Sequence, residues 1–353
     1  MLKIAPESIH GRGAAANPAN RFAAIELERD GDRDPAEDPS PATRFYRDST
    51  SAIINYNDSP DIGFSASINP YRGCEHGCIY CYARPTHEYL GWSAGLDFET
   101  RIMVKQDAPE LLRRELSSRK WKPQVIAMSG VTDCYQPAER RFQITRRCLA
   151  VLAEFRNPVG IVTKNHLVTR DIDHLQELAR HQAAVVYLSV TTLDPELAQK
   201  LEPRAPLPKH RLSTIRQLSE AGVPVGVLAA PMIPAVNNHE LPAILSAAAE
   251  AGARFASYTV LRLPYGLGPL FEDWLVRHFP DRKDKVLHQI REMREGKLND
   301  PNFGSRMRGQ GIFADQIKQL FHAARRKAGI GEGGPELSIA SFRIPAGPQL
   351  TLL

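Results

Sequence analysis

The chain has 353 residues, a formal net charge of +5 at pH 7 and 42% hydrophobic residues. This length allows one large α/β domain with additions or two domains, and the composition is that of an ordinary globular protein. The first residues, MLKIAPESIHGRG, lack the apolar core of a signal peptide. The longest apolar run, VPVGVLAAPMIPAV from Val223, is too short to span a bilayer. We therefore expect a cytoplasmic protein with no membrane partner.

Residues 1–60 are expected to form an N-terminal extension that is flexible in part. The stretch ERDGDRDPAEDPSP, from Glu28 to Pro41, is charged, contains prolines and has no large apolar residue. Such a composition cannot bury enough apolar surface to order itself, so it predicts a mobile linker.

Residues 61–265 are expected to form the core domain, because six short aliphatic runs alternate there with amphipathic stretches. Continuous apolar strands separated by helices indicate a parallel sheet that is buried on both faces. Six such units favour a partial (β/α)6 barrel, with functional residues at the carboxyl ends of the strands. A doubly wound open sheet is the alternative that periodicity alone does not exclude. The predicted strands are SASI at 65–68, VIAM at 125–128, VGIVT at 159–163, VVYLSV at 185–190, VPVGVLAA at 223–230 and FASYTVL at 255–261.

Two of the intervening segments have clear helical periodicity. Residues 138–155 place their apolar side chains, with Cys148 among them, on one face, so we expect Cys148 in the core. Residues 171–182 begin with Asp171, a residue type suited to the N-cap of a helix.

Residues 266–330 are expected to be basic and mostly helical, and residues 331–353 to form a C-terminal tail. Residues 271–330 contain thirteen Lys or Arg against eight Asp or Glu. This excess predicts a docking surface for nucleic acid through its phosphates. The alternative is a solvated helical surface, since acids such as Asp284, Glu292 and Glu295 suit pairing along a helix. The main cations are Arg277, Arg282, Lys283, Lys285, Arg291, Arg294, Lys297, Arg306, Arg308, Arg325, Arg326 and Lys327.

Three of the five cysteines lie together as C-x3-C-x2-C, at Cys74, Cys78 and Cys81, directly after the first core strand. A structural zinc site normally takes four protein ligands, and a disulfide framework takes an even number of cysteines. Three thiolates suit a [4Fe–4S] cluster that keeps one iron open for a cosubstrate. A zinc site completed by His76 or His87 is the alternative.

The cysteine loop, INPYRGCEHGCIYCYARPTHEYLG at residues 68–91, resembles the signature of the radical SAM superfamily. The resemblance implies a partial (β/α)6 barrel, a [4Fe–4S] cluster and S-adenosylmethionine (SAM) bound at the open iron. It also implies one-electron reduction of SAM to methionine and a 5′-deoxyadenosyl radical, which removes hydrogen from a substrate. The electron would come from an external flavodoxin- or ferredoxin-like partner.

Further stretches are similar to the branch of that superfamily related to spore photoproduct lyase, often called DNA repair photolyase-like. They follow the second, third and fourth predicted strands, and the likeness covers roughly residues 66–263. These stretches are SGVTDCYQPAE at 129–139, VTKN at 162–165 and LSVTTLDPELAQKLEPRAP at 188–206.

The resemblance also proposes cosubstrate contacts. In many relatives an acid-ended turn after the second strand receives the SAM amino group, and here that turn offers Thr132 and Asp133. Lys164 is expected to neutralise the SAM carboxylate, unless it is a surface residue, and Thr132 alternatively caps a helix. The other expected cofactor-binding residues are Ser189 and Thr191 for the ribose or methionyl part, Tyr80 beside Cys81, and Arg204, which orients the SAM carboxylate or Glu202 or forms a structural ion pair.

Cys134 is the candidate catalytic residue, as a hydrogen donor to a substrate radical. In the lyase pattern the donor cysteine directly precedes the polar residue of the turn, where this chain has Val131. Cys134 is therefore displaced by comparison with that pattern, and identity with the lyase does not follow.

Three functions remain open from the sequence. The first is a radical SAM enzyme that acts on nucleic acid, on a DNA lesion or a modified RNA. The second is the same enzyme class with a peptide or small-metabolite substrate, although peptide-modifying members commonly carry extra cysteines and this chain has none after Cys148. The third is a non-catalytic zinc- or cluster-binding module.

Overall fold

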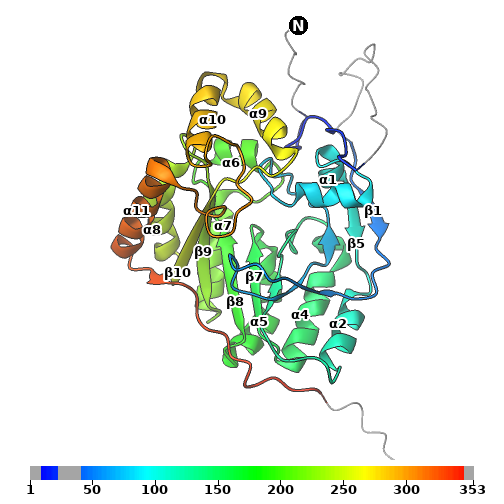
Figure 1. Cartoon of the computed structure of the whole chain (residues 1–353). Helices are drawn as coiled ribbons and strands as arrows, with labels where there is room; N and C mark the ends of the chain where they lie inside the picture. Colours follow the sequence, from blue (N-terminus) through cyan, green and yellow to red (C-terminus); the bar gives the residue numbers. More distant parts are fainter. Residues whose placement is uncertain (1–8, 23–40, 346–353) are drawn as a thin grey trace, which may run out of the picture.

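The computed structural model describes residues 9–22 and 41–345, with the side chain of Glu332 excepted. Apart from Pro41, the predicted linker from Glu28 to Pro41 lies outside the described residues. The centre of the molecule is an eight-stranded sheet in the order β11-β10-β9-β8-β7-β6-β3-β2 (Figure 1). Neighbouring strands are parallel except for β2, which pairs antiparallel with β3.

All six predicted core strands are confirmed, so the fold is a mixed α/β fold with a parallel sheet. They correspond in chain order to β3, β6, β7, β8, β9 and β10. The strands of this sheet are β2 (Ile54–Tyr56), β3 (Ala66–Ile68), β6 (Ile126–Met128), β7 (Val159–Thr163), β8 (Ala184–Ser189), β9 (Val225–Met232), β10 (Phe255–Val260) and β11 (Gly331–Glu332).

Helices connect successive strands, as in the βαβ pattern expected for a parallel sheet. Figure 1 shows α8 and α11 to the left of the sheet and α2 and α4 to the right. The connecting helices are α2 (Ala108–Leu116), α3 (Glu139–Phe142), α4 (Ile144–Phe155), η3 (His166–Asp171), α5 (Ile172–Arg180), α6 (Pro195–Leu201), α7 (Pro208–Glu220), η4 (Asn238–Glu240) and α8 (Leu241–Glu250).

The predicted helix over residues 138–155 is split in two. Gln143 adopts a left-handed conformation with φ of 52°, so α3 ends there and α4 begins directly after it. The Glu139 carboxylate accepts hydrogen bonds from the backbone N–H groups of Thr145 and Arg146, at 3.0 and 3.3 Å, and so caps α4. Asp171 occupies the predicted N-cap position of α5 but makes no capping bond, because its carboxylate pairs with Arg146.

A second, three-stranded sheet supports the cysteine loop. Its order is β1-β5-β4, and β4 ends one residue before Gly73, which precedes Cys74. The loop itself continues into η2 and α1, which return the chain to β5. The elements are β1 (Arg44–Arg47), β4 (Tyr71–Arg72), η2 (Arg84–Leu90), α1 (Leu96–Thr100) and β5 (Arg101–Val104).

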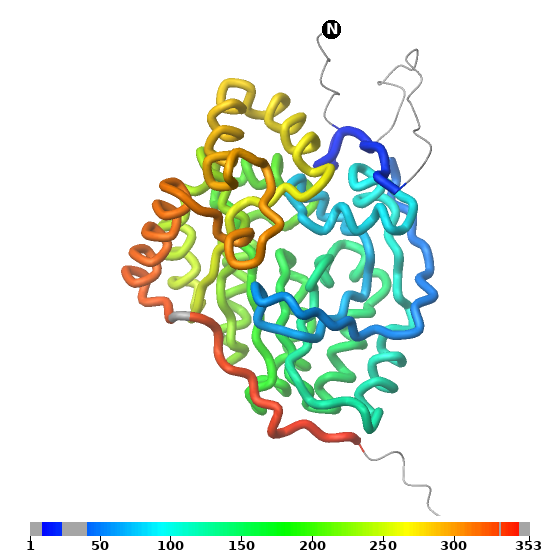
Figure 2. Tube along the Cα trace, viewed as in Figure 1, coloured from blue at the N-terminus to red at the C-terminus, as the bar shows by residue number. Residues whose placement is uncertain are grey.

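The region after β10 is mostly helical, as predicted. Its helices α9 and α10 pack on the cysteine loop through a second hydrophobic cluster that includes Ile79, Phe271 and Trp274. The tube in Figure 2 shows the yellow part of this region beside the dark blue N-terminal segment. No helix among the described residues is long and apolar enough to cross a membrane. The helices are α9 (Leu267–His278), η5 (Pro280–Arg282), α10 (Lys283–Glu292) and α11 (Gly311–Lys327).

Candidate active site

Short backbone bonds fold the cysteine loop into a compact turn. The Cys74 N–H donates to the Phe98 carbonyl at 2.9 Å, and the Cys81 N–H donates to the Cys78 carbonyl at 3.2 Å. Gly77 has φ of 67°, and a Cβ there would lie 2.7 Å from a carboxylate oxygen of Glu99. Glycine adopts a positive φ without strain and has no Cβ to clash with Glu99. The close packing of Glu99 behind the loop therefore requires glycine at position 77.

A buried ion pair between Arg84 and Glu99 holds the loop from behind. Both side chains are 0% exposed. The Arg84 guanidinium also donates to the carbonyls of Gly77 and Cys78, at 3.1 and 2.9 Å, and to those of Ala94 and Gly95, at 3.2 and 2.9 Å. A guanidinium presents five N–H donors in a fixed fork, so this one side chain fixes the path of two loops.

The N-terminal segment 9–22, which we call the strap, closes over the same ion pair. The N–H groups of Gly13 and Ala14 donate to the Glu99 carboxylate at 3.1 and 2.9 Å. A Cβ on Gly13 would lie 1.8 Å from the Gly77 carbonyl oxygen, so the strap touches the cysteine loop directly.

The three thiols of the loop are free and close together. Burial is the main cause that raises the pKa of Cys74, and the neighbouring thiols Cys78 and Cys81 raise it further. Burial likewise raises the pKa of Cys78 to about 12, against the opposing effect of the Lys164 charge. Three soft thiol donors in one loop fit a cluster that is held at three of its irons.

The two histidines of the zinc alternative are bonded elsewhere. His76 lies 3.4 Å from an Asp133 oxygen through Nδ1 and 3.3 Å from the Asn165 amide through Nε2. His87 donates from Nε2 to the Arg101 carbonyl at 2.9 Å and packs against Phe98. Among the described residues, no group of three or more His, Cys, Asp or Glu is placed to hold a single metal ion.

Polar side chains from β7 and β8 lie beside Cys78, at the carboxyl ends of the strands. Lys164, directly after β7, lies 3.4 Å from the Ser189 hydroxyl and 4.0 Å from the nearest Glu202 carboxylate oxygen. Its side chain is 17% exposed, so it is no ordinary surface lysine. Burial lowers the pKa of Lys164, but the adjacent Cys78 and Glu202 raise it and leave the net shift upward.

Glu202 joins Tyr80 and Thr191 in a buried hydrogen-bonded group. Its carboxylate accepts from the Tyr80 hydroxyl and from the Thr191 hydroxyl, the latter at 2.7 Å, and it pairs with Arg211. Burial alone would raise the pKa of Glu202, but the charges of Arg211 and Lys164 hold it at about 2. The group brings the predicted residues Tyr80 and Thr191 together with Lys164.

Asp133 and Thr132 have different surroundings. The Asp133 carboxylate accepts from the Thr163 hydroxyl at 2.7 Å and from the Lys164 N–H at 2.9 Å. Burial opposes its ionisation, yet His76 and these donors lower the pKa of Asp133 to about 2. The Thr132 hydroxyl instead donates to the Tyr71 carbonyl at 2.8 Å, and the side chain is buried. Its proposed contact with SAM stays a prediction.

Arg204 is paired with Glu75 rather than with Glu202. Its guanidinium lies 3.1 Å from a Glu75 carboxylate oxygen, and its backbone N–H donates to the His76 carbonyl at 3.2 Å. Arg204 thus fixes the front of the cysteine loop, and any role toward SAM stays a prediction.

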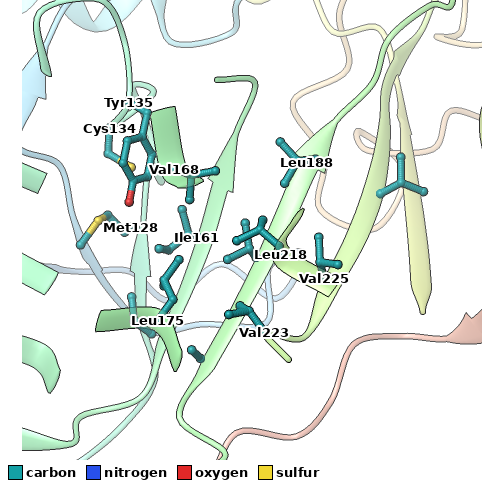
Figure 3. Close-up of a cluster of buried hydrophobic side chains, with 14 of the residues drawn as sticks. Met128, Cys134, Tyr135, Ile161, Val168, Leu175, Leu188, Leu218, Val223 and Val225 are labelled. Carbon is teal, nitrogen blue, oxygen red and sulfur yellow. The ribbon is translucent and has the colours of Figure 1, made fainter. Parts of the chain in front are cut away.

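Cys134 lies in the hydrophobic core rather than at the open end of the sheet. It is 0% exposed and belongs to the same cluster as Met128 and Ile161. Figure 3 shows its side chain beside Tyr135. The thiol is fully buried among these apolar side chains. Its role as a hydrogen donor stays an untested prediction. Cys148 is 0% exposed in the same core, as predicted.

The sequence did not predict the roles of four charged residues of this site, although Glu202 was considered as a partner of Arg204. Arg84, Glu99, Glu202 and Arg211 are all fully or almost fully buried. Each lies in a segment that reads as an ordinary polar loop or helix face, so the sequence offers no local signal of burial.

The model of the radical SAM superfamily matches residues 68–248, which span the cysteine loop and most of the parallel sheet. The chain belongs to the radical SAM superfamily. Radical SAM enzymes bind a [4Fe–4S] cluster and SAM and need an external reductant, so the chain is a radical SAM enzyme with these cofactors. The family membership therefore excludes a non-catalytic module.

Relatives of this radical SAM protein occur in bacteria and archaea. The uncharacterized protein Rv2578c of Mycobacterium tuberculosis is 33% identical over 261 residues, which cover 73% of this chain and 76% of that protein. The uncharacterized protein MJ0683 of Methanocaldococcus jannaschii is 31% identical over 170 residues, which cover 47% of this chain and 60% of that protein.

Solved structures of spore photoproduct lyase share the fold. The lyase complexed with dinucleoside spore photoproduct matches with a TM-score of 0.59 at 15% identity, covering 82% of this chain and 80% of that chain. A lyase variant with bound AdoMet and dinucleoside spore photoproduct matches with a TM-score of 0.54 at 16% identity, covering 80% of this chain and 77% of that chain.

Proposed function

We propose that Cys74, Cys78 and Cys81 hold the [4Fe–4S] cluster and that the enzyme removes hydrogen from a nucleic-acid substrate. What supports the cluster assignment is the presence of three free thiols in one loop, which the buried Arg84–Glu99 pair holds in place. The chemistry that the bound cofactors supply is reductive cleavage of SAM to a 5′-deoxyadenosyl radical.

Lys164 is the residue that we propose for the SAM carboxylate. It carries a positive charge into a mostly buried position beside Cys78, where a charge-assisted bond is stronger than a neutral one. The Ser189 hydroxyl lies within reach of the same ammonium group, so it is proposed as the next polar contact.

The carboxylates of Asp133 and Glu202 are proposed to organise this cradle. Asp133 fixes the backbone at Lys164, and Glu202 fixes Tyr80 and Thr191. Both carboxylates are ionised at neutral pH, since their pKa values lie near 2. They therefore also balance the positive charge that SAM brings.

Nucleic acid is the proposed substrate class for two reasons. The fold matches that of spore photoproduct lyase complexed with a dinucleoside lesion. Residues 271–330 also carry an excess of cations, several of which are exposed on α10 and α11. A peptide or small metabolite is the alternative substrate. We further propose a flavodoxin- or ferredoxin-like reductant and a cytoplasmic location, where thiols stay reduced.

The direct test is anaerobic SAM cleavage by the reconstituted protein in the presence of DNA, RNA or a protein-free metabolite extract. Deuterium from labelled substrate should appear in 5′-deoxyadenosine when nucleic acid is present. Deuterium transfer from the metabolite extract alone would favour the alternative substrate. SAM cleavage without any transfer from nucleic acid would contradict the proposed substrate and leave the cofactor assignment intact.

A further inference from the structure

Three exposed aromatic side chains gather around one arginine beside the cysteine loop. Phe22, Tyr89 and Tyr265 are 58%, 72% and 67% exposed. The rings of Phe22 and Tyr89 have centroids 5.0 Å apart. The Arg21 guanidinium lies 4.7 Å from the Phe22 centroid, 5.9 Å from that of Tyr89 and 3.8 Å from that of Tyr265. We call these four residues the aromatic rim.

Three segments far apart in the sequence build the rim. Arg21 and Phe22 end the described part of the strap, Tyr89 lies in η2, and Tyr265 lies in the loop between β10 and α9. Figures 1 and 2 show the dark blue strap passing beside the start of α9. Single exposed apolar side chains are normal on a protein surface, but clusters of them are uncommon. Such clusters often mark binding surfaces.

The strap is anchored so that the rim keeps its shape. The Asn20 amide donates to the carbonyls of Glu88 and Trp92 at 2.9 and 3.0 Å. The Arg21 guanidinium donates to the Glu88 carboxylate at 2.6 Å, and the Glu88 side chain is only 4% exposed. A ring platform that is already ordered loses little entropy when it binds a ligand.

The rim belongs to the same segment as the cysteine loop. η2 begins three residues after Cys81, and Ala83 packs against Cys74 and Cys81. Tyr82, which lies between Cys81 and Ala83 in the sequence, is 51% exposed. Its hydroxyl donates a hydrogen bond to the carbonyl of Gly130, just after β6. Tyr265 lies in the loop that follows β10, and the carboxyl ends of parallel strands meet at one edge of a sheet, so the rim shares segments with the end of the sheet where the proposed cofactors bind.

The electrostatics of the rim favour stacking over charge pairing. Glu88 neutralises the charge of Arg21, so the exposed surface offers ring faces and the flat guanidinium rather than a net positive charge. Aromatic rings and guanidinium planes stack on nucleobases, whatever the base, because every base has a π-face. A base is free to stack in this way only when it is unpaired.

We propose that the aromatic rim stacks unpaired nucleobases next to the reactive base and so makes single-stranded or locally opened nucleic acid the preferred substrate form. This inference rests on the proposed nucleic-acid substrate. An acidic redox protein is the competing occupant, but the neutral rim offers it no charge complementarity.

The test compares single-stranded oligonucleotide binding by the reconstituted protein and by three variants, Phe22→Ala, Tyr89→Ala and Tyr265→Ala. The probe is a fluorescent oligothymidylate or oligouridylate at low salt. Loss of one stacked base costs roughly 1–3 kcal/mol, so each variant should bind about 5- to 150-fold more weakly. Tyr56→Ala is the matched control, since Tyr56 is 66% exposed on β2 and is expected to leave affinity unchanged.

Several outcomes are decisive. Tyr89→Phe and Tyr265→Phe should restore binding, since they keep the ring, and all variants should retain iron content and SAM binding. If the wild-type protein binds single strands but no better than the three alanine variants, the rim does not stack nucleobases. The proposed nucleic-acid substrate would be unaffected by that result. Wild-type protein that binds no nucleic acid at all would overturn both. Variants that slow reduction by flavodoxin but keep oligonucleotide affinity would assign the rim to the reductant instead.

Discussion

Two regions of the molecule use the charges of their arginines differently. Behind the cysteine loop, the buried guanidinium of Arg84 binds four carbonyl groups and one carboxylate, and no part of it faces solvent. In residues 271–330 the cations are divided. Arg326 and Lys327 are exposed on α11, whereas Arg325 next to them is buried and donates to the Ile330 carbonyl at 3.0 Å.

Other cations of the C-terminal region are also structural. Arg294 is 2% exposed and donates to the carbonyls of Arg306 and Leu261, at 2.8 and 2.7 Å. Arg306 pairs with Asp61, and Arg308 lies 3.8 Å from the centroid of the Tyr258 ring. The charge excess in the sequence therefore overstates the cations that are available to a partner. Whether an arginine is available to a partner depends on whether backbone carbonyls already accept its hydrogen bonds. The number of arginines in the region does not show this.

The largest expected effect is at the thiols that the first region positions. Changing any one of Cys74, Cys78 or Cys81 to Ala should abolish reductive SAM cleavage, because each is proposed to hold one iron. Cys148→Ala should retain cleavage, since Cys148 lies in the core. Product analysis for 5′-deoxyadenosine measures both. Full activity in any of the three loop variants would contradict the cluster assignment.

The buried ion pair itself should be the next most sensitive feature. Glu99→Ala leaves the Arg84 guanidinium without its carboxylate partner in a fully buried place. Breaking such a pair from one side costs roughly 3–5 kcal/mol, which denaturant unfolding of the cofactor-free protein should detect. Glu154→Ala is the control, because the Arg113–Glu154 pair is 47% and 38% exposed and an exposed pair is worth at most about 1 kcal/mol. An equal loss in the free energy of unfolding in both variants would contradict the claim that the buried pair contributes more to stability than the exposed pair.

The cosubstrate contacts should separate Lys164 from Thr132. Lys164→Met removes a charged hydrogen-bonding group, which typically costs roughly 1.5–3 kcal/mol, so SAM affinity should fall about 10- to 150-fold. Thr132→Val should mainly lower stability, because the Thr132 hydroxyl bonds to the Tyr71 carbonyl. SAM titration of the reconstituted protein measures both. A larger loss of affinity for Thr132→Val than for Lys164→Met would assign the SAM contact to Thr132.

A histidine of the first region should make its stability depend on pH. Burial lowers the pKa of His87 from 6.5 to about 4, so the folded protein keeps this ring neutral while the unfolded chain binds a proton. Stability is therefore fully present above about pH 6.5 and is lost as the pH falls toward 4. Between pH 7 and 5 the cofactor-free wild type should lose roughly 2 kcal/mol more than His87→Phe in denaturant unfolding. The same pH dependence in both proteins would show that His87 does not titrate this way.

The smallest effect concerns the exposed cations. Replacing Arg326 and Lys327 together by Gln should reduce the slope of log affinity against log salt by roughly 1.4–1.8, if each contacts one phosphate, without changing stability. Arg325→Gln should lower stability instead, since it removes the bond to the Ile330 carbonyl. An unchanged salt slope in the double variant would place nucleic acid elsewhere on the molecule.

Much of the fold was predictable because strand and helix periods are local properties. All six core strands lie where the aliphatic runs predict them. The predicted helix over residues 138–155 forms as two helices that are separated at Gln143. That break is set by the Glu139 carboxylate and by the backbone conformation of one residue, which no periodicity reveals. The strands β1, β4 and β5 were missed because their small sheet depends on pairing between distant, short and partly polar segments.

The site divides in the same way. The cysteine spacing is a local motif, and it pointed directly to the superfamily whose model matches residues 68–248. Glu202 and Arg211 become a buried pair only when β8, α6 and α7 meet, so their role is visible in three dimensions alone. Cys134 is adjacent in sequence to Asp133, yet their side chains have opposite surroundings, the core and the polar cradle.

The central claim is that the three thiols of the cysteine loop hold a [4Fe–4S] cluster. Iron and sulfide analysis, with electron paramagnetic resonance of the reduced protein after anaerobic reconstitution, tests it most directly. The account predicts about four irons per chain, a signal that shifts when SAM is added, and loss of both when Cys74, Cys78 and Cys81 are replaced together by Ala. A wild-type protein that binds zinc and retains no iron, or a triple variant that keeps the cluster, would contradict it.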